Sequence, residues 1–232
     1  MTEAQKPKQY VSLSGGKDST AMLLLMLEKG EPIEQVIFFD WGMEFPEIYE
    51  HLEKLEKHVG VKITRLYPKG LWEWWAFERE LTKGKSQGTI GYGLPTMKAR
   101  WCTKIKTDAI DKMAKNGETS IGITVDEIKR VNGRITPMFG YHENGRYKYP
   151  LVEANMTEKD CLQFCYDRGF DFGGLYKYFD RVSCWCCPFK SKREFVNLEK
   201  HFPEYWKKIL EFRRRDADRL KLLGVSKTEV SK

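Results

Sequence analysis

The chain has 232 residues, of which 41% are hydrophobic and 31% charged, and its formal net charge is +7 at pH 7. This composition is typical of a globular protein with one large domain, or one domain and a small appendage. It excludes a membrane span, because the longest apolar run, within 19–27, is too short to cross a bilayer. Residues 1–8 lack the apolar core of a signal peptide and are expected to be a disordered lead-in, so we expect a cytoplasmic protein without a membrane partner. The positive charge favours anionic partners such as nucleotides, RNA or DNA.

The first third of the chain alternates between strand and helix patterns. Apolar runs and helical periodicity predict strands at 10–13, 35–40 and 61–67, with helices at 19–27 and 46–59 between them. Alternating elements of these lengths imply βαβ units. We therefore expect an α/β fold with a doubly wound, mostly parallel sheet.

The remaining two thirds of the chain are richer in helix. Here the pattern predicts a helix at 71–81, a flexible glycine-rich loop at 84–95 that could act as a lid, a helix at 104–115, a strand at 119–125, a β-hairpin at 134–152, a helix from 157 to about 169, and a helical region at 192–223. We expect a nucleotide-binding α/β domain over residues 9–155. A small cysteine-rich, helical region over residues 156–232 is expected to pack on it.

A short stretch at residues 14–19, Ser-Gly-Gly-Lys-Asp-Ser, separates the first predicted strand from the first predicted helix. Its two glycines let the backbone turn sharply, and the helix that follows presents unpaired N–H groups at the positive end of its dipole. Lys17 adds a cation, and Ser14 and Ser19 add hydroxyl donors. The stretch therefore predicts a phosphate or pyrophosphate site. The alternative is an ordinary glycine turn between a strand and a helix.

This stretch fits neither G-x-x-x-x-G-K-[ST] nor G-x-G-x-x-G, but it resembles the PP-loop, S-G-G-x-D-S, of the ATP pyrophosphatase superfamily. Members of that superfamily bind ATP or an adenylylated nucleotide, and many cleave ATP between its α and β phosphates. The resemblance implies that the nucleotide is held by Ser14, Gly15, Gly16, Lys17, Asp18 and Ser19.

Three further segments resemble motifs of the phosphoadenosine phosphosulfate (PAPS) reductase family. Residues 39–47 resemble its D-T-G-x-x-F-P-E-T motif. Residues 100–106 resemble the R-W-C-T-x-x-K segment of its phage and bacterial relatives, and residues 121–130 resemble its G-x-R-x-x-E-x-x-R segment. Because the motifs occur in the expected order and spacing, the chain is identified as a member of that family from about residue 9 to about residue 212.

The resemblance implies an adenine nucleotide alpha hydrolase-like fold and a site for ATP, APS or PAPS. The predicted catalytic residues are Lys17, Asp18, Arg100 and Lys104. The three basic residues among them are fixed cations, which stabilise the charge that builds up on departing pyrophosphate. Asp18 or Asp40 could contact a Mg²⁺ ion that bridges the phosphates, although Asp40 could also be only a cap at a strand end. Further candidates to contact the nucleotide are Asp40, Lys106, Gly122, Glu127 and Arg130.

Clustered cysteines are the second signal. Residues 184–187 contain a C-x-x-C pair with a third cysteine inside it, and such a turn can place two thiolates on one metal. The resemblance places Cys102 nearby, so we expect a [4Fe–4S] cluster, with Zn²⁺ or a set of unmetallated thiols as the alternatives. Cys161 and Cys165, at i and i+4 of one helix, are expected in the core instead. The predicted metal ligands are Cys102, Cys184, Cys186 and Cys187.

The favoured functional hypothesis is an ATP pyrophosphatase that adenylylates a substrate and is linked to sulfur transfer through the cysteine-bound cluster. This follows from the resemblance to sulfur-transfer relatives that thiolate tRNA or modify DNA. It implies tRNA or DNA as the sulfur acceptor, and a cysteine desulfurase or another protein as a partner.

Two other hypotheses remain open. One is a sulfonucleotide reductase that uses a non-standard thiol such as Cys186. The reductases of this family use a cysteine in a C-terminal E-C-G-x-H segment, and this chain has no cysteine after Cys187. The other is a nucleotide-binding subunit of a nucleic-acid modification or defence complex.

Overall fold

The computed structural model describes residues 8–83, 87–127 and 146–223. Within them lies a sheet of five strands in the order β3-β2-β1-β4-β5, and all four pairings are parallel. This sheet confirms the α/β class that the alternating pattern predicts. The strands are β1 (Lys8–Leu13), β2 (Ile33–Phe39), β3 (Ile63–Leu66), β4 (Gly117–Ile121) and β5 (Tyr147–Lys148).

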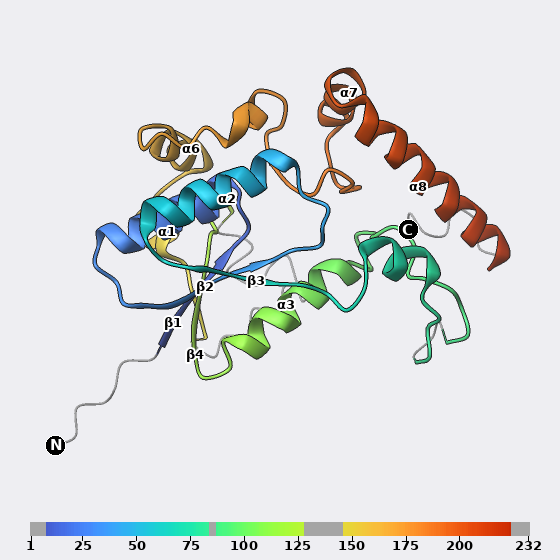
Figure 1. The fold of residues 1–232 in the computed structure, drawn as a ribbon, viewed down its shortest axis with the longest axis horizontal. Helices are drawn as coiled ribbons and strands as arrows, with labels where there is room; N and C mark the ends of the chain where they lie inside the picture. Colours follow the sequence, from blue (N-terminus) through green and yellow to red (C-terminus); the bar gives the residue numbers. More distant parts are fainter. Residues whose placement is uncertain (1–7, 84–86, 128–145, 224–232) are drawn as a thin grey trace.

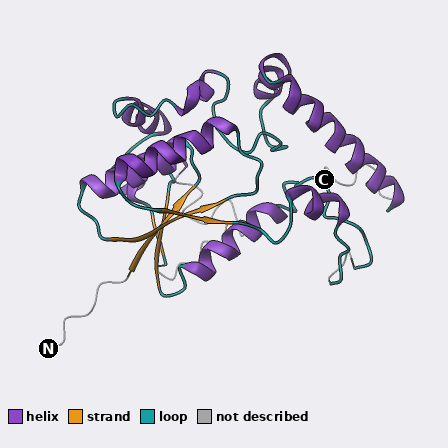
Figure 2. Ribbon diagram, viewed as in Figure 1, coloured by secondary structure: helices purple, strands orange, loops and turns teal. Residues whose placement is uncertain are grey.

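Helices cover both faces of the sheet (Figures 1 and 2), as expected for a doubly wound fold. The helices are α1 (Lys17–Glu28), α2 (Pro46–Val59), α3 (Trp101–Met113), α5 (Pro150–Glu153), α6 (Glu158–Tyr166), α7 (Lys192–His201) and α8 (Pro203–Leu222). Three tighter or wider turns are η1 (Trp74–Glu78, π-helical), η2 (Val125–Glu127) and η4 (Phe172–Lys177). Among the described residues, no helix combines the length and the apolar character needed to cross a bilayer.

The strand order explains where a ligand can bind. The chain moves outward from β1 to β2 and β3, with α1 and α2 on one face of the sheet. It then returns to β4 on the other side of β1, and α3 lies on the opposite face. Right-handed crossovers require this change of face when the direction of travel reverses. The loops after β1 and β4 therefore separate, and they leave a crevice at the carboxyl edge of the sheet.

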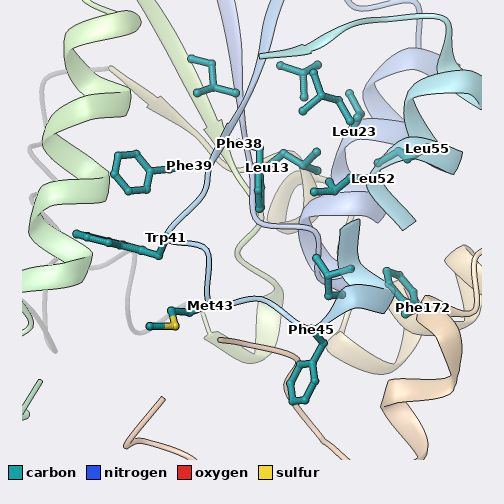
Figure 3. Close-up of a cluster of buried hydrophobic side chains, with 14 of the residues drawn as sticks. Leu13, Leu23, Phe38, Phe39, Trp41, Met43, Phe45, Leu52, Leu55 and Phe172 are labelled. Carbon is teal, nitrogen blue, oxygen red and sulfur yellow. The ribbon is translucent and has the colours of Figure 1, made fainter. Parts of the chain in front are cut away.

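The central strands are held by a closely packed apolar core (Figure 3). Leu13 of β1 pairs in register with Phe38 of β2, and neither side chain has any exposed surface. Leu23 of α1 and Leu52 of α2 are equally buried in the same cluster. Burying each of these side chains contributes about 1.5–3 kcal/mol, so the core fixes the strand ends from which the loops project.

The C-terminal helices are as predicted in type, but a break divides the last helical region. α6 begins with the capping box expected at Thr157 and Asp160, and it packs against α1. The predicted helical region 192–223 is divided at Phe202, whose backbone is not helical (φ −136°, ψ 56°). Pro203 causes this break, because a proline disfavours helical geometry in the residue before it.

Two predicted elements are wrong in extent. The helix expected at 71–81 is reduced to the short turn η1, and Glu80 already pairs with Ile90 as a β-bridge. Most of the β-hairpin expected at 134–152 lies outside the described residues. Its described end is not a hairpin, because β5 pairs in parallel with β4 and is followed by helix α5.

The described part of the glycine-rich loop 84–95 is anchored to α8. The Arg219 guanidinium donates to the carbonyl oxygen of Gly91 at 3.0 Å, and the Asp216 carboxylate accepts from the Leu94 N–H at 3.1 Å. Backbone hydrogen bonds also join this loop to the turn η1 and the residues after it. The described part is therefore held to α8 and η1 by hydrogen bonds, and its flexibility and its role as a lid stay predictions.

Candidate nucleotide and cysteine site

A cavity of about 690 Å³ opens at the carboxyl edge of the sheet. Its lining comes chiefly from the end of β1 with the start of α1, the end of β2 and the residues after it, α3, the segment after β4, and residues 181–190, and Tyr176 of η4 also contributes. The cavity thus occupies the crevice that the reversal of strand order creates. Its lining includes both the glycine loop and the cysteine segment, which are about 170 residues apart in the sequence.

The glycine loop forms one end of this cavity. Gly15 has a left-handed backbone (φ +79°), and a Cβ atom there would lie 2.8 Å from Ile48 Cγ2, so only glycine fits between the loop and α2. The Ser14 N–H donates to Ser19 Oγ at 3.0 Å, and the two serine hydroxyls are 2.9 Å apart. These contacts close the loop over the start of α1. The loop residues that line the cavity are Ser14, Gly16, Asp18 and Ser19.

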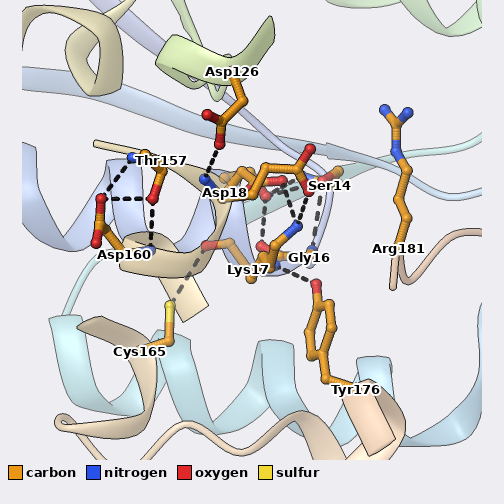
Figure 4. A network of polar contacts seen from close by, with 12 residues as sticks. Ser14, Gly16, Lys17, Asp18, Asp126, Thr157, Asp160, Cys165, Tyr176 and Arg181 are labelled. Carbon is orange, nitrogen blue, oxygen red and sulfur yellow. Dashed lines mark hydrogen bonds and ion pairs between the residues drawn. The ribbon is translucent and has the colours of Figure 1, made fainter. Parts of the chain in front are cut away.

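Lys17 belongs to the loop, but its side chain faces α6 and does not line the cavity. Its Nζ atom lies 2.6 Å from Glu158 Oε2 and 3.3 Å from Asp18 Oδ2, and the residue is only 4% exposed. Burial lowers the pKa of Lys17, but the two carboxylates outweigh burial and leave the pKa raised. The predicted catalytic lysine is therefore a charged, buried group held by a residue of α6 (Figure 4).

Asp18 is the acidic group of the loop. Burial raises its pKa to about 6; Lys17 opposes this shift, and the negative charge of Glu158 adds to it. One carboxylate oxygen, Oδ2, accepts from Lys17, whereas Oδ1 is buried and has no hydrogen-bond partner in the described part of the chain. An unpartnered carboxylate oxygen facing a cavity is a suitable ligand for a hard cation such as Mg²⁺.

Asp40 occupies the end of β2, as predicted, but its side chain serves its own loop. Its Oδ1 accepts from the Gly42 N–H at 2.6 Å and from the Tyr49 hydroxyl at 2.8 Å. Among the described residues that line the cavity, its neighbours Phe39 and Trp41 are present and Asp40 is not. The geometry therefore favours the strand-end cap, and contact with ribose or a metal stays a prediction.

The first half of α3 presents one face to the cavity. Cys102, Thr103, Lys106 and Thr107 line the cavity, as expected for residues spaced three to four apart on a helix. Lys104 lies off this face: its side chain is 75% exposed and pairs with Asp108. The catalytic role predicted for Lys104 is therefore not supported by its position, whereas Lys106 is placed to meet an anion.

The cation that precedes α3 is also at the cavity. Arg100 lines the cavity, and its guanidinium carbon lies 4.3 Å from the ring centroid of Phe189. An aromatic face attracts a guanidinium and restricts where it can point. The structure thus places Arg100 between the nucleotide end and the cysteine segment.

Residues after β4 form the opposite wall. Gly122 and Glu127 both line the cavity, as predicted. A Cβ atom at Gly122 would lie 2.9 Å from the backbone nitrogen of Ser19, so a glycine is needed where β4 passes the start of α1. Arg130, predicted to contact the nucleotide, lies outside the described residues.

The four predicted metal ligands surround the other end of the cavity. Cys186 is buried and Cys184 is half-buried, and loss of solvent around their thiols raises the pKa of both well above the usual range. Burial also raises the pKa of Cys102, and the nearby Cys187 adds to that shift. Two distant segments, α3 and residues 184–187, therefore bring their thiols within electrostatic range of one another.

These thiols are not arranged as a closed metal site. No group of three or more His, Cys, Asp or Glu side chains within the described ranges is positioned to hold a metal ion. The Cys184 thiol instead donates to Glu44 Oε1 at 3.2 Å. Four thiols are a suitable donor set for a cluster or for zinc, but Cys184 must leave Glu44 to join the others.

The remaining two cysteines are core residues, as predicted. Cys161 and Cys165 have no exposed surface, and the Cys165 thiol donates to the backbone oxygen of Lys17 at 3.4 Å. Burial raises the pKa of both thiols, that of Cys165 to about 12. They are therefore packed between α6 and α1 as neutral thiols.

Several site residues carry no assignment in the sequence analysis. Glu44 lies inside the segment 39–47 that resembles a family motif, but no motif letter gives it a role, and Arg181 lies three residues before the cysteine segment. Glu158 and Tyr176 come from beyond the sheet and reach the loop only through the packing of α6 and η4. Tyr176 accepts a hydrogen bond from the Lys17 N–H at 2.6 Å, and Arg181 extends alongside the loop (Figure 4).

The doubly wound sheet and the strand, glycine loop and helix at its centre define a PP-loop protein of the α/β class. The family model described as phosphoadenosine phosphosulfate reductase domain matches residues 8–190, and the chain belongs to this family.

Two relatives come from Methanocaldococcus jannaschii, and both are uncharacterized proteins. One is 30% identical over 213 residues, covering 89% of this chain and 41% of the relative. The other is 27% identical over 239 residues, covering 98% of this chain and 52% of the relative. The chain thus spans about half the length of the curated relatives that it matches.

Two solved structures share the fold. The U34-tRNA thiolase NcsA from Methanococcus maripaludis, solved with its [4Fe–4S] cluster, has a TM-score of 0.50 and 17% identity, covering 91% of this chain and 73% of NcsA. The PAPS reductase from Candida auris, in a phosphate complex, has a TM-score of 0.51 and 15% identity, covering 78% of this chain and 83% of the reductase. At these identities the likeness concerns the fold alone.

Proposed function

We propose that this protein is an ATP-using enzyme that adenylylates its substrate, releases pyrophosphate, and links this activation to sulfur chemistry at its cysteines. One observation carries the proposal: the PP-loop and all four clustered cysteines line the same cavity. A volume of about 690 Å³ is within the range of small-molecule sites and accommodates a nucleotide together with a second reactant.

The nucleotide end supplies binding and charge stabilisation. An oxygen of the substrate attacks the α-phosphorus of ATP, the bond between the α-phosphorus and the bridging oxygen breaks, and pyrophosphate leaves with the electron pair. The substrate's proton passes to solvent. Arg100 and Lys106 line the path of the departing charge, and preorganised cations stabilise such charge most strongly. The unpartnered Asp18 Oδ1 is the atom best suited to hold a Mg²⁺ ion bound to the phosphates.

The cysteine end would hold a [4Fe–4S] cluster through Cys102, Cys184, Cys186 and Cys187. The donor chemistry supports this assignment, and NcsA, with a similar fold, carries such a cluster. If only three of these thiols bound the cluster, its fourth iron would be open and could carry sulfur. The basic charge of the chain suits tRNA or DNA as the acceptor, since +7 favours anionic partners.

The test uses protein purified without oxygen. Incubation with ATP and bulk tRNA, then in parallel with DNA, is expected to release pyrophosphate, and elemental analysis is expected to give iron and sulfide. Lys104→Ala serves as a matched control, because that lysine is exposed. Absence of pyrophosphate together with sulfite release from APS or PAPS would replace the proposal with sulfonucleotide reduction. Nucleotide binding without turnover until another protein is added would favour a subunit of a larger complex.

A further inference from the structure

Tyr176 brings a hydroxyl group to the glycine loop from outside the sheet. It lies in η4, about 160 residues after the loop, and it lines the same cavity. The Lys17 N–H donates to its Oη atom at 2.6 Å. A Cβ atom on Gly16 would lie 3.3 Å from that oxygen. The hydroxyl therefore sits against the first turn of α1, where an anion is expected to bind.

The ring of Tyr176 is firmly held. Phe172 packs edge-on to it with ring centroids 5.0 Å apart, and Lys17 Nζ lies 5.6 Å from its centroid. The turn that carries it is seated on α2, since a Cβ atom at Gly173 would lie 2.5 Å from Glu47 Cγ. Phe172 and Leu175 are each only 1% exposed. A ligand that enters the cavity will therefore meet this hydroxyl rather than displace it.

The Tyr176 hydroxyl is placed so that it can donate a hydrogen bond to a ligand. It already accepts from the Lys17 N–H, and its own proton meets no acceptor in the described part of the chain. Accepting one hydrogen bond polarises a hydroxyl and strengthens the bond that it donates. Burial raises the pKa of Tyr176 well above its usual value, with the negative charge of Asp18 adding to this shift, so the phenol keeps its proton.

We propose that the Tyr176 hydroxyl donates a hydrogen bond to the phosphates of the bound nucleotide and is a binding residue of this site. The inference deepens the proposed function and rests on it. In this proposal η4, the turn after α6, both packs on α2 and binds the phosphates directly through Tyr176. In the competing arrangement, which we call a plug, the Tyr176 hydroxyl blocks the site. It accepts the hydrogen bond of the Lys17 N–H, so that this N–H is not available to a phosphate.

Calorimetric titration with ATP, inorganic pyrophosphate and adenosine tests the inference. Tyr176→Phe retains the ring and its packing, and it is expected to bind ATP and pyrophosphate about tenfold more weakly, because one hydrogen bond to a charged group is lost. Its affinity for adenosine is expected to be unchanged. Tyr178→Phe, at the residue that follows η4, is the matched control and should bind all three ligands as the wild type does. Thermal melting checks that both variants are folded.

Each other result has a distinct meaning. Tighter binding of ATP by Tyr176→Phe would show that the hydroxyl is a plug and would overturn the inference. Equal binding by Tyr176→Phe and the wild type would overturn the inference and leave the nucleotide site standing. Wild-type protein that binds neither ATP nor pyrophosphate would overturn the proposed function and this inference together.

Discussion

The two ends of the cavity are built in different ways. The glycine loop is formed by six consecutive residues that join the end of β1 to the first turn of α1, and its serine hydroxyls and backbone groups already bond to one another. The cysteine end combines α3 with residues 184–187, and its thiols are partly or fully buried and not arranged around a common centre in the described part of the chain. The loop is thus preorganised by the fold, whereas the cysteine end needs its ligand to complete it.

Charge explains part of this difference. At the loop, the cation of Lys17 is balanced by Asp18 and Glu158. At the cysteine end, a thiolate would be buried beside the Glu44 carboxylate, and like charges close together are unfavourable. A bound metal supplies the positive charge that removes this penalty, since metal binding deprotonates its thiol ligands. Four predictions test the comparison.

The largest effect is expected from Lys17→Ala. Lys17 does not line the cavity, but removing its charge leaves the Glu158 and Asp18 carboxylates unpaired beside the loop, where their negative charge opposes phosphate binding, so turnover of ATP should fall by at least about 100-fold. Calorimetry and pyrophosphate release measure the two effects. Lys104→Ala is the matched control and should retain activity, because that side chain is exposed and pairs with Asp108. Wild-type ATP affinity in Lys17→Ala would contradict the assignment of the loop.

The next effect concerns metal content at the cysteine end. Wild-type protein purified anaerobically is expected to be brown, with absorbance near ~400 nm from cysteine-ligated iron. Cys102→Ser should lose most of that iron, because one of four ligands is removed. Cys161→Ala, in the core of α6, should retain it. A colourless wild type with one zinc ion would reject the cluster and keep the ligands.

A smaller effect is expected from low pH on the stability of the contact between α1 and α2, where Thr20 of α1 meets His51 of α2. His51 bonds to the Thr20 hydroxyl at 3.0 Å and stacks on Phe172 at 4.3 Å. Burial lowers its pKa from 6.5 to about 4. His51 binds a proton more readily in the unfolded chain than in the folded protein. The stability that neutral His51 contributes is therefore fully present above pH 6.5 and is lost as pH falls toward 4.

This shift corresponds to a loss of about 2 kcal/mol at pH 5 relative to pH 8. Urea denaturation of the wild type and of His51→Gln at the two pH values measures it. The variant should lack this part of the pH dependence, although it is less stable at pH 8. The same loss of stability in both proteins would assign the acid sensitivity to other groups.

The smallest effect is expected from Tyr49→Phe, which removes one hydrogen bond to Asp40. The loop after β2 should lose about 1 kcal/mol of stability, the usual worth of one such bond. ATP affinity should be unchanged if Asp40 serves only its own loop. Tyr67→Phe, at a 64% exposed position, is the control. A marked loss of ATP affinity in Tyr49→Phe would instead make Asp40 part of the nucleotide site.

The parts of the site that could be predicted from the sequence are those made by neighbouring residues. The PP-loop and its flanking strand and helix are local, so the motif and the periodicity together specify them. The sequence does not tell which of Lys104 and Lys106 faces the cavity. That depends on the residue at which α3 begins and on which of its faces packs inward. A motif identifies a segment, but it does not say which side chain faces the cavity.

Site residues that are far from the loop in the sequence are not indicated by any motif. Glu158 reaches Lys17 only because α6 packs on α1, and Tyr176 does so only because η4 is seated on α2. The cysteines were recognised by their spacing, yet their present arrangement depends on a balance of burial and charge that spacing does not encode. Long-range packing and an absent ligand thus account for most of what the sequence left open.

The clamp between α8 and the loop near Leu94 has a consequence for how the protein is made. The Asp216 carboxylate that accepts from the Leu94 N–H is 122 residues further along the chain. At usual rates of translation, roughly 6 to 24 seconds pass before the ribosome has added those residues. During this interval the central strands and the PP-loop can already form, but one wall of the cavity lacks its anchor. The nascent chain therefore has the residues of its phosphate loop well before it has the helix that anchors the segment near Leu94.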